Sequence, residues 1–211
     1  MIILVVILFI VGAFIWLSFT VFPAISGYGS KNLCSAIYLQ HRNAADVINE
    51  DLSKFPLSLG SFTVNENDAS VTGSVWGMAK RKTIYRKGIG CTMVNDFSEA
   101  DIRKQKFLLP SPTKTNSEAI PWPYGDKVVE TTSTKINKAL LQSAVDNIMQ
   151  ATTLDGYSAY TRATIIVYDG NIIAEEYAPG FDKNTVMLGW SVSKSLTAAM
   201  IGILVKENKL S

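Results

Sequence analysis

The chain of 211 residues has few of the side chains that usually bind metals or activate nucleophiles. It contains one histidine, His41, and two cysteines, Cys34 and Cys91. A structural zinc site with four cysteine or histidine ligands cannot be assembled from three such residues. A Ser/His/Asp triad would have to use His41.

Charged residues are absent from the first 25 positions, although 18% of the whole chain is charged. Residues 2–21 are almost wholly apolar, and at 1.5 Å per residue they match the ~30 Å hydrocarbon core of a bilayer. We therefore predict a transmembrane anchor over residues 1–25, with membrane contact through residues 2–22. A cleaved signal peptide is the alternative, but its apolar stretch is usually about 7–15 residues and follows basic residues.

The rest of the chain has the composition of a globular body. Lysine and arginine number 20 against 18 acidic residues, a net charge of +2, which excludes a strongly basic nucleic-acid-binding chain.

Lys31 and Arg42 follow the anchor and weakly favour a cytoplasmic body. The cysteines argue for an oxidising compartment if they pair, since such a disulfide would be worth roughly 3–4 kcal/mol. Two buried free thiols remain the alternative.

Residues 31–126 are predicted to form a small α+β unit and a proline-bearing linker. Residues 26–30, rich in glycine and serine, are interpreted as a flexible exit from the membrane. The basic residues 80–82 and 86–87 predict a solvated sheet edge or, less favoured, a surface that attracts anionic lipid or polymer. Helical spacing of apolar residues predicts a helix at 43–52 with Asn43 as its N-cap. Apolar runs, alternation and turn residues predict strands at 36–39, 61–64, 70–76, 83–85 and 91–94.

Residues 127–211 are predicted to contain a helix, a hairpin and a second helix. The first helix begins at Thr134, after a cap at Thr132 or Ser133. Asp169-Gly170, a dipeptide favoured in tight hairpins, joins the predicted strands 163–168 and 171–177. An apolar helix follows over residues 192–208.

Ser191 and Lys194 are three residues apart at the start of that last helix, so both side chains project from one face. A partly desolvated lysine can accept a serine proton without a histidine. The helix N-terminus favours negative charge on Ser191 Oγ, and the Ser191 N–H can serve as an oxyanion donor. The same spacing occurs at 111–114 and 132–135, but only the third example opens a strongly apolar helix. From this pattern, catalysis competes evenly with a structural role as N-cap and snorkelling side chain.

The segment Ser191-Val-Ser-Lys194, with its preceding hairpin and the following residues 202–211, resembles the serine β-lactamase and penicillin-binding-protein superfamily. More narrowly, it is similar to class C β-lactamase-like hydrolases, a group that includes esterases, D-aminopeptidases and aminohexanoate-oligomer hydrolases. Further segments resemble a membrane-anchored branch of β-lactamase-related serine hydrolases, namely residues 33–35, 88–92, 121–126, 178–181 and 188–191.

The resemblance implies that Ser191 is the acyl-accepting nucleophile and Lys194 its proton partner, in a β-lactamase/transpeptidase-like domain over residues 127–211. The implied reaction is acyl-enzyme formation on a small-molecule or peptide-like amide or ester, with no metal or cofactor. Proteins of this kind act outside the cytoplasm. The resemblance therefore implies a periplasmic body and favours a Cys34–Cys91 disulfide.

The family also has a Tyr-x-Asn or Ser-x-Asn element and a Lys/His-Thr/Ser-Gly strand downstream of the nucleophile, and neither follows Ser191. We therefore expect a C-terminally truncated domain and a weak or inactive fragment. The alternative is a non-catalytic envelope protein that binds a partner on the same scaffold. A triad with His41 is the weakest alternative, because His41 falls in the N-terminal unit.

Overall fold

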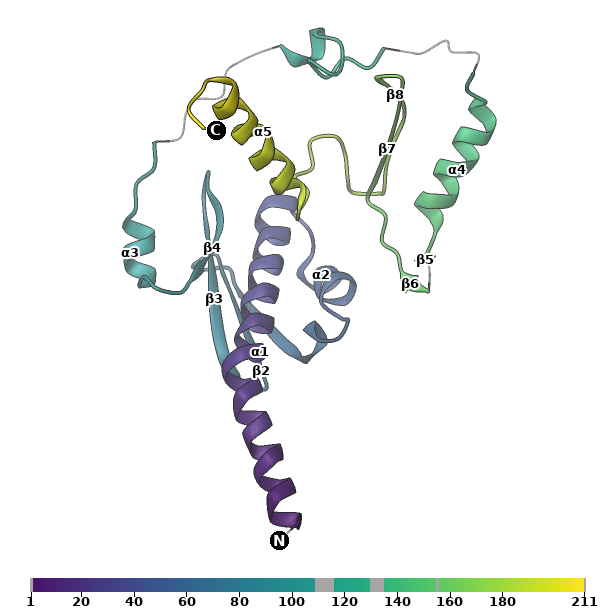
Figure 1. Cartoon of the computed structure of the whole chain (residues 1–211). Helices are drawn as coiled ribbons and strands as arrows, with labels where there is room; N and C mark the ends of the chain where they lie inside the picture. Colours follow the sequence, from purple (N-terminus) through teal and green to yellow (C-terminus); the bar gives the residue numbers. More distant parts are fainter. Residues whose placement is uncertain (1, 109–115, 130–134, 155, 211) are drawn as a thin grey trace. The chain divides into compact units, whose positions relative to one another are not determined.

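The computed structural model describes residues 2–108, 116–129, 135–154 and 156–210 (Figure 1). The fold is mixed α+β, with a long apolar N-terminal helix and a small antiparallel sheet, as the sequence predicts. The chain divides into two compact units, the first formed by residues 1–104 and 186–211 and the second by residues 105–185.

The first unit is built around α1, a 39-residue helix whose second half packs against a four-stranded antiparallel sheet (Figure 1). The strands pair in chain order, which confirms the four strands predicted from alternation and turn residues. Several boundaries differ: β3 begins at Met78, five residues earlier than predicted, and Trp76 lies in the turn after β2 and not within the strand. The elements are α1 Ile2–Gln40, β1 Gly60–Asn65, β2 Ser70–Val75, β3 Met78–Arg86 and β4 Gly90–Val94.

Four short elements complete this unit. Helix α2 confirms the predicted helix, and the Asn43 side chain caps it by accepting a hydrogen bond from the Ala45 N–H at 2.8 Å. The last helix, α5, also confirms a predicted element and ends two residues earlier than expected. The bounds are α2 Ala44–Asp51, η1 Leu57–Leu59, α3 Glu99–Lys104 and α5 Val192–Lys206.

Two predictions for residues 26–39 were wrong, because both the flexible exit at 26–30 and the strand at 36–39 belong to α1. The glycines and serines of this segment permit close packing between the helix and the sheet. A Cβ added at Gly29 would lie 2.1 Å from the Phe62 ring, so a larger residue there would force that ring to move. The buried hydroxyls of Ser30 and Thr83 are hydrogen-bonded at 2.9 Å, joining α1 to β3.

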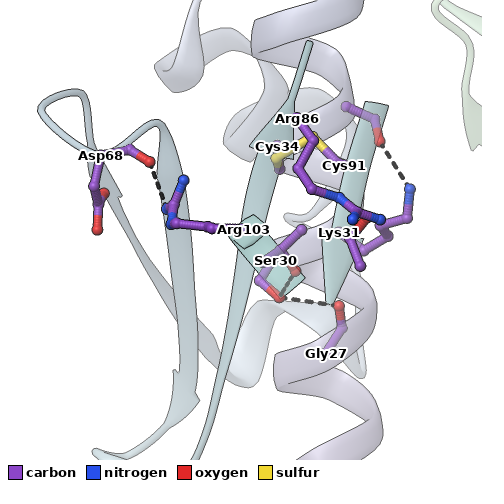
Figure 2. The surroundings of a disulfide bond; sticks show 11 residues. Gly27, Ser30, Lys31, Cys34, Asp68, Arg86, Cys91 and Arg103 are labelled. Atoms are coloured by element: carbon purple, nitrogen blue, oxygen red, sulfur yellow. Dashed lines mark hydrogen bonds between the residues drawn. A yellow bond between two sulfur atoms is a disulfide. The ribbon is translucent and has the colours of Figure 1, made fainter. Parts of the chain in front are cut away.

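A disulfide between Cys34 and Cys91 links α1 to β4 (Figure 2). Their Cα atoms are 6.1 Å apart, and the bond closes a loop across 57 positions of the chain. Leu33 and Val71 are fully buried beside it in the same hydrophobic cluster. The covalent link therefore lies within the core of the first unit.

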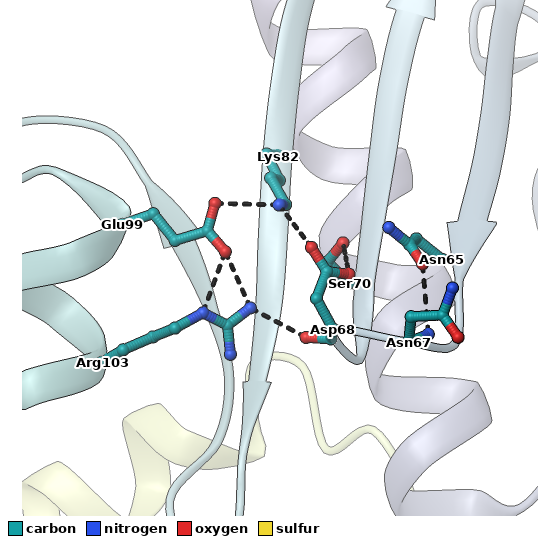
Figure 3. A network of polar contacts seen from close by, with 7 residues as sticks. All are labelled: Asn65, Asn67, Asp68, Ser70, Lys82, Glu99 and Arg103. Atoms are coloured by element: carbon teal, nitrogen blue, oxygen red, sulfur yellow. Dashed lines mark hydrogen bonds and ion pairs between the residues drawn. The ribbon is translucent and has the colours of Figure 1, made fainter.

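Lys82 of β3 forms ion pairs with Asp68 at 2.7 Å and Glu99 at 2.8 Å, and Figure 3 shows it between the two carboxylates. Arg103 extends the network by pairing with Glu99 and donating to the Asp68 carbonyl at 2.8 Å. The interpretation of residues 80–82 as a sheet edge fits Lys80 and Arg81, which have a strand neighbour only on the β2 side. It does not fit Lys82, which pairs with β2 on one side and with β4 on the other.

The second unit contains a helix packed against a two-stranded hairpin. Asp169 and Gly170 have φ values of 46° and 73°, so the predicted tight turn is confirmed. Helix α4 begins later than predicted, with Asn137 as its cap, and the predicted caps Thr132 and Ser133 lie outside the described residues. The bounds are η2 Ser117–Ala119, α4 Lys138–Gln150, β5 Thr153–Leu154, β6 Tyr157–Ser158, β7 Ala163–Tyr168 and β8 Asn171–Tyr177.

Candidate functional site

The candidate site lies where the chain enters α5. Trp190 has a φ of 44°, a left-handed conformation that is strained for a bulky residue, and it turns the backbone into the helix. The Val192 N–H donates to the Gly189 carbonyl at 2.8 Å, and the Lys194 N–H donates to the Ser191 carbonyl at 3.0 Å. These bonds fix the backbone of the first helical turn.

The first helical turn brings the two predicted site residues together. Lys194 Nζ donates a hydrogen bond to Ser191 Oγ at 2.8 Å. Three-residue spacing on a helix places both side chains on one face, which explains the contact. The pair has the distance that proton exchange between an amine and a hydroxyl requires.

If Ser191 were only a helix cap, its hydroxyl would accept a hydrogen bond from a backbone N–H of the first helical turn. Ser191 occupies the N-cap position, but its side chain makes no capping hydrogen bond. The neighbouring Ser193 hydroxyl donates to the Trp190 carbonyl at 3.0 Å and is committed to the backbone. The Ser191 hydroxyl therefore contacts Lys194, whereas the Ser193 hydroxyl is bonded to the backbone.

Ser191 and Lys194 are both exposed to solvent, as is most of α5. The apolar side chains of Leu196, Met200 and Ile203 are each more than half exposed. Water competes for hydrogen bonds at such a site and screens the field of the helix N-terminus. The Ser191–Lys194 pair is therefore not shielded from water.

A cavity of about 530 Å³ beside the start of α5 was missed by the sequence analysis. Lys31 lies in its wall, donates to Ser35 Oγ at 3.5 Å, and has its pKa lowered by burial. The four wall residues of α1 are three or four positions apart and therefore share one helical face. This pattern was missed because residues 26–30 were expected to form a flexible exit. The lining consists of Tyr28, Lys31, Asn32, Ser35, Leu188, Trp190 and Ser193.

The remaining candidates do not form a site in the described residues. His41 is exposed at the end of α1, where a φ of 58° and a bond from the Arg42 N–H to the Ala36 carbonyl close the helix. The serine of the 111–114 motif and the threonine of the 132–135 motif lie outside those residues. Within the described ranges, no group of three or more histidine, cysteine, aspartate or glutamate residues could hold a metal ion.

Comparison of the chain with protein-family models, with curated proteins and with solved structures found no match. The resemblance to β-lactamase-related hydrolases therefore rests on the sequence motifs alone.

Proposed function

We propose that this chain is a membrane-anchored serine hydrolase that forms an acyl-enzyme on Ser191, with Lys194 as its proton partner. The observation that carries the proposal is the 2.8 Å contact between Lys194 Nζ and Ser191 Oγ, together with the missing cap bond of Ser191. The substrate class is a small-molecule or peptide-like amide or ester. The family resemblance of the segment supports the same assignment.

The proposed reaction has two steps. Ser191 Oγ attacks the substrate carbonyl carbon while its proton passes to the neutral Lys194 amine, and Lys194 returns that proton to the departing amine or alcohol. Water then attacks the acyl-enzyme ester, Lys194 takes the water proton, and the proton returns to Ser191 Oγ as the acid leaves. The Ser191 N–H at the helix start is the expected oxyanion donor. Because the pair is exposed, we expect slow acylation.

The first helix is long and apolar enough to cross a membrane, a property that signal sequences share. The packing of α1 against the sheet supports an anchor that stays attached to the body. Phe22 and Ile25 are each only 3% exposed and form one cluster with Val75 of the sheet. Cleavage near residue 25 would remove both side chains from the core, so we propose that α1 is retained. The Cys34–Cys91 disulfide, a bond typical of oxidising compartments, supports a body on the periplasmic side.

A non-catalytic envelope binding module is the second candidate function. The exposed apolar length of α5 favours it, since none of the described residues of that helix is buried. A helix with this composition buries apolar surface when it binds a partner. In this case Ser191 would have no chemical role, and probes of serine nucleophiles would not distinguish it from other serines.

A fluorophosphonate probe on the detergent-solubilised full chain tests the proposal. We expect slow labelling that Ser191→Ala abolishes. Lys194→Ala should slow labelling by about 100-fold or more, because general base catalysis of that size would be lost. Intact-mass measurement and peptide mapping would locate the modified serine.

Two matched variants control for changes in folding. Ser193→Ala removes a neighbouring hydroxyl that is bound to the backbone, and Lys206→Ala removes a lysine from the far end of the same helix. Both should label at the parent rate. Absence of labelling, or equal labelling of the Ser191→Ala protein, would contradict acylation of this chain at Ser191 and favour the binding module.

A further inference from the structure

Trp76 lies at the tip of the turn between β2 and β3, beside the apolar part of α1. Its ring stacks on Phe14 with centroids 6.4 Å apart, and it meets the Phe22 ring edge-on at 5.4 Å. Despite these contacts, 61% of the Trp76 side chain is exposed. A large aromatic residue therefore stands outside the core and next to the predicted membrane helix.

The turn itself is unusual for the residue that occupies it. Val75 pairs with Met78, so Trp76 and Gly77 form a two-residue loop with φ values of 50° and 79°. Asparagine or aspartate normally precedes glycine in such turns, because they tolerate positive φ better than bulky residues. Local backbone preference does not account for a tryptophan here, and strained residues of this kind gather at functional positions.

The aromatic contacts fix the level of Trp76 along α1. Phe14 lies inside the apolar run of residues 2–21, seven positions before its end, which is about 10 Å along the helix axis. Phe22 lies just past that end. The headgroup zone on each side of a bilayer is roughly 5–7 Å thick, so the Trp76 ring falls at the boundary between hydrocarbon and headgroups. Tryptophan is enriched at this boundary in membrane proteins.

Arg81 of β3, the strand that follows this turn, provides a second marker. It lines a cavity with Pro23 and Ala24, and its Cγ would lie 3.7 Å from a Cβ added at Gly27. Arg81 is therefore level with the first turns of α1 beyond the apolar run. At this height an arginine can reach lipid phosphates, and the order of tryptophan below arginine matches the polarity gradient of a membrane surface.

We propose that the β2–β3 turn is a second membrane contact, in which Trp76 inserts at the hydrocarbon–headgroup boundary of a phospholipid bilayer. A single spanning helix leaves the body free to tilt and rotate about its exit point. A second contact at the turn holds the sheet at a fixed height and orientation on the membrane. The contact depends on α1 being inserted, and it is independent of chemistry at Ser191.

Tryptophan quenching in vesicles tests the proposal with the full chain. The variant W16F/W122F/W190F keeps Trp76 as its sole tryptophan and is reconstituted into phosphatidylcholine with or without bromine near the headgroup end of the acyl chains. We expect Trp76 to lose most of its emission in the brominated vesicles and to resist quenching by aqueous acrylamide. Its emission should also lie to the blue of free tryptophan in water.

Two further proteins calibrate the measurement. In W76F/W122F/W190F, Trp16 reports insertion of α1 and should be quenched by the brominated lipid. In W16F/W76F/W122F/W190F/I89W, the probe moves to the turn at the opposite end of β3, a nine-residue strand about 30 Å long. That probe should respond to acrylamide and not to the lipid.

Three results would overturn the proposal. Trp76 that responds like the I89W probe would place the turn in water. Trp76 shielded from both quenchers would mean that protein covers it. Failure of the brominated lipid to quench Trp16 would mean that α1 is not inserted, so that the turn has no membrane beside it.

Discussion

At the scale of single residues, Lys82 controls the charge state of two carboxyl groups. Its hydrogen bonds hold the pKa of Asp68 and that of Glu99 below their usual values, and the same bonds raise the pKa of Lys82. Removing the cation with Lys82→Met should raise both carboxyl pKa values toward 3.8 and 4.5, their ordinary positions. Carbon-detected NMR titration of the two carboxyl groups checks this prediction.

The sign of the pH dependence follows from these directions. Carboxyl groups with lowered pKa values stabilise the fold above their unfolded values near pH 4, and this contribution is lost as pH falls through the folded values. The raised Lys82 pKa adds stability that is lost only above about pH 10.5. The stability gap between parent and Lys82→Met proteins should therefore shrink between about pH 7 and about pH 3. Lys80→Met, two residues away on the same strand face, should show no such convergence.

At the scale of elements, the packing of α1 on the sheet depends on glycine at the points of closest approach. A Cβ added at Gly73 of β2 would lie 2.3 Å from the Ser26 carbonyl oxygen, which belongs to the backbone of α1. Gly73→Ala should therefore destabilise the first unit by about 1–3 kcal/mol, the usual cost of overpacking. Chemical denaturation monitored by circular dichroism measures the loss. Gly12→Ala adds a Cβ to α1 with nothing within 4 Å and should not destabilise the protein.

The same close packing explains which elements the sequence could predict. Strands β1 to β4 follow from alternation and turn residues because each has neighbours close in the chain. Residues 26–30 have the composition of a linker in isolation, but they continue α1 and pack against Phe62 and Thr83, which are distant in the sequence. The Ser191–Lys194 contact was predictable because three-residue spacing at a helix start determines it. The left-handed Trp190 and the cavity beside α5 arise from contacts that no local pattern encodes.

At the scale of the whole molecule, α1 joins a segment apolar and long enough to cross a membrane to the core of the body. Its first half carries the apolar run, and its second half supplies Leu33, Cys34 and Ala36 to the core of the sheet. Cys34 lies 13 residues past the end of that run, about 20 Å along the axis, and the disulfide ties β4 to it there. The disulfide therefore holds the sheet at a fixed height along α1 above the proposed membrane surface. It forms only in an oxidising compartment.

The disulfide gives the last prediction. Cys34→Ser combined with Cys91→Ser should lower the free energy of unfolding by about 3–4 kcal/mol, because the open chain regains the entropy of a 57-residue loop. Denaturation of the parent with and without reductant should give the same difference, and reductant should not affect the double variant. A thiol-reactive mass tag should fail to modify the unfolded, unreduced parent and should add twice after reduction. Tagging of both cysteines before reduction would show that the bond is absent and remove the argument for an exported body.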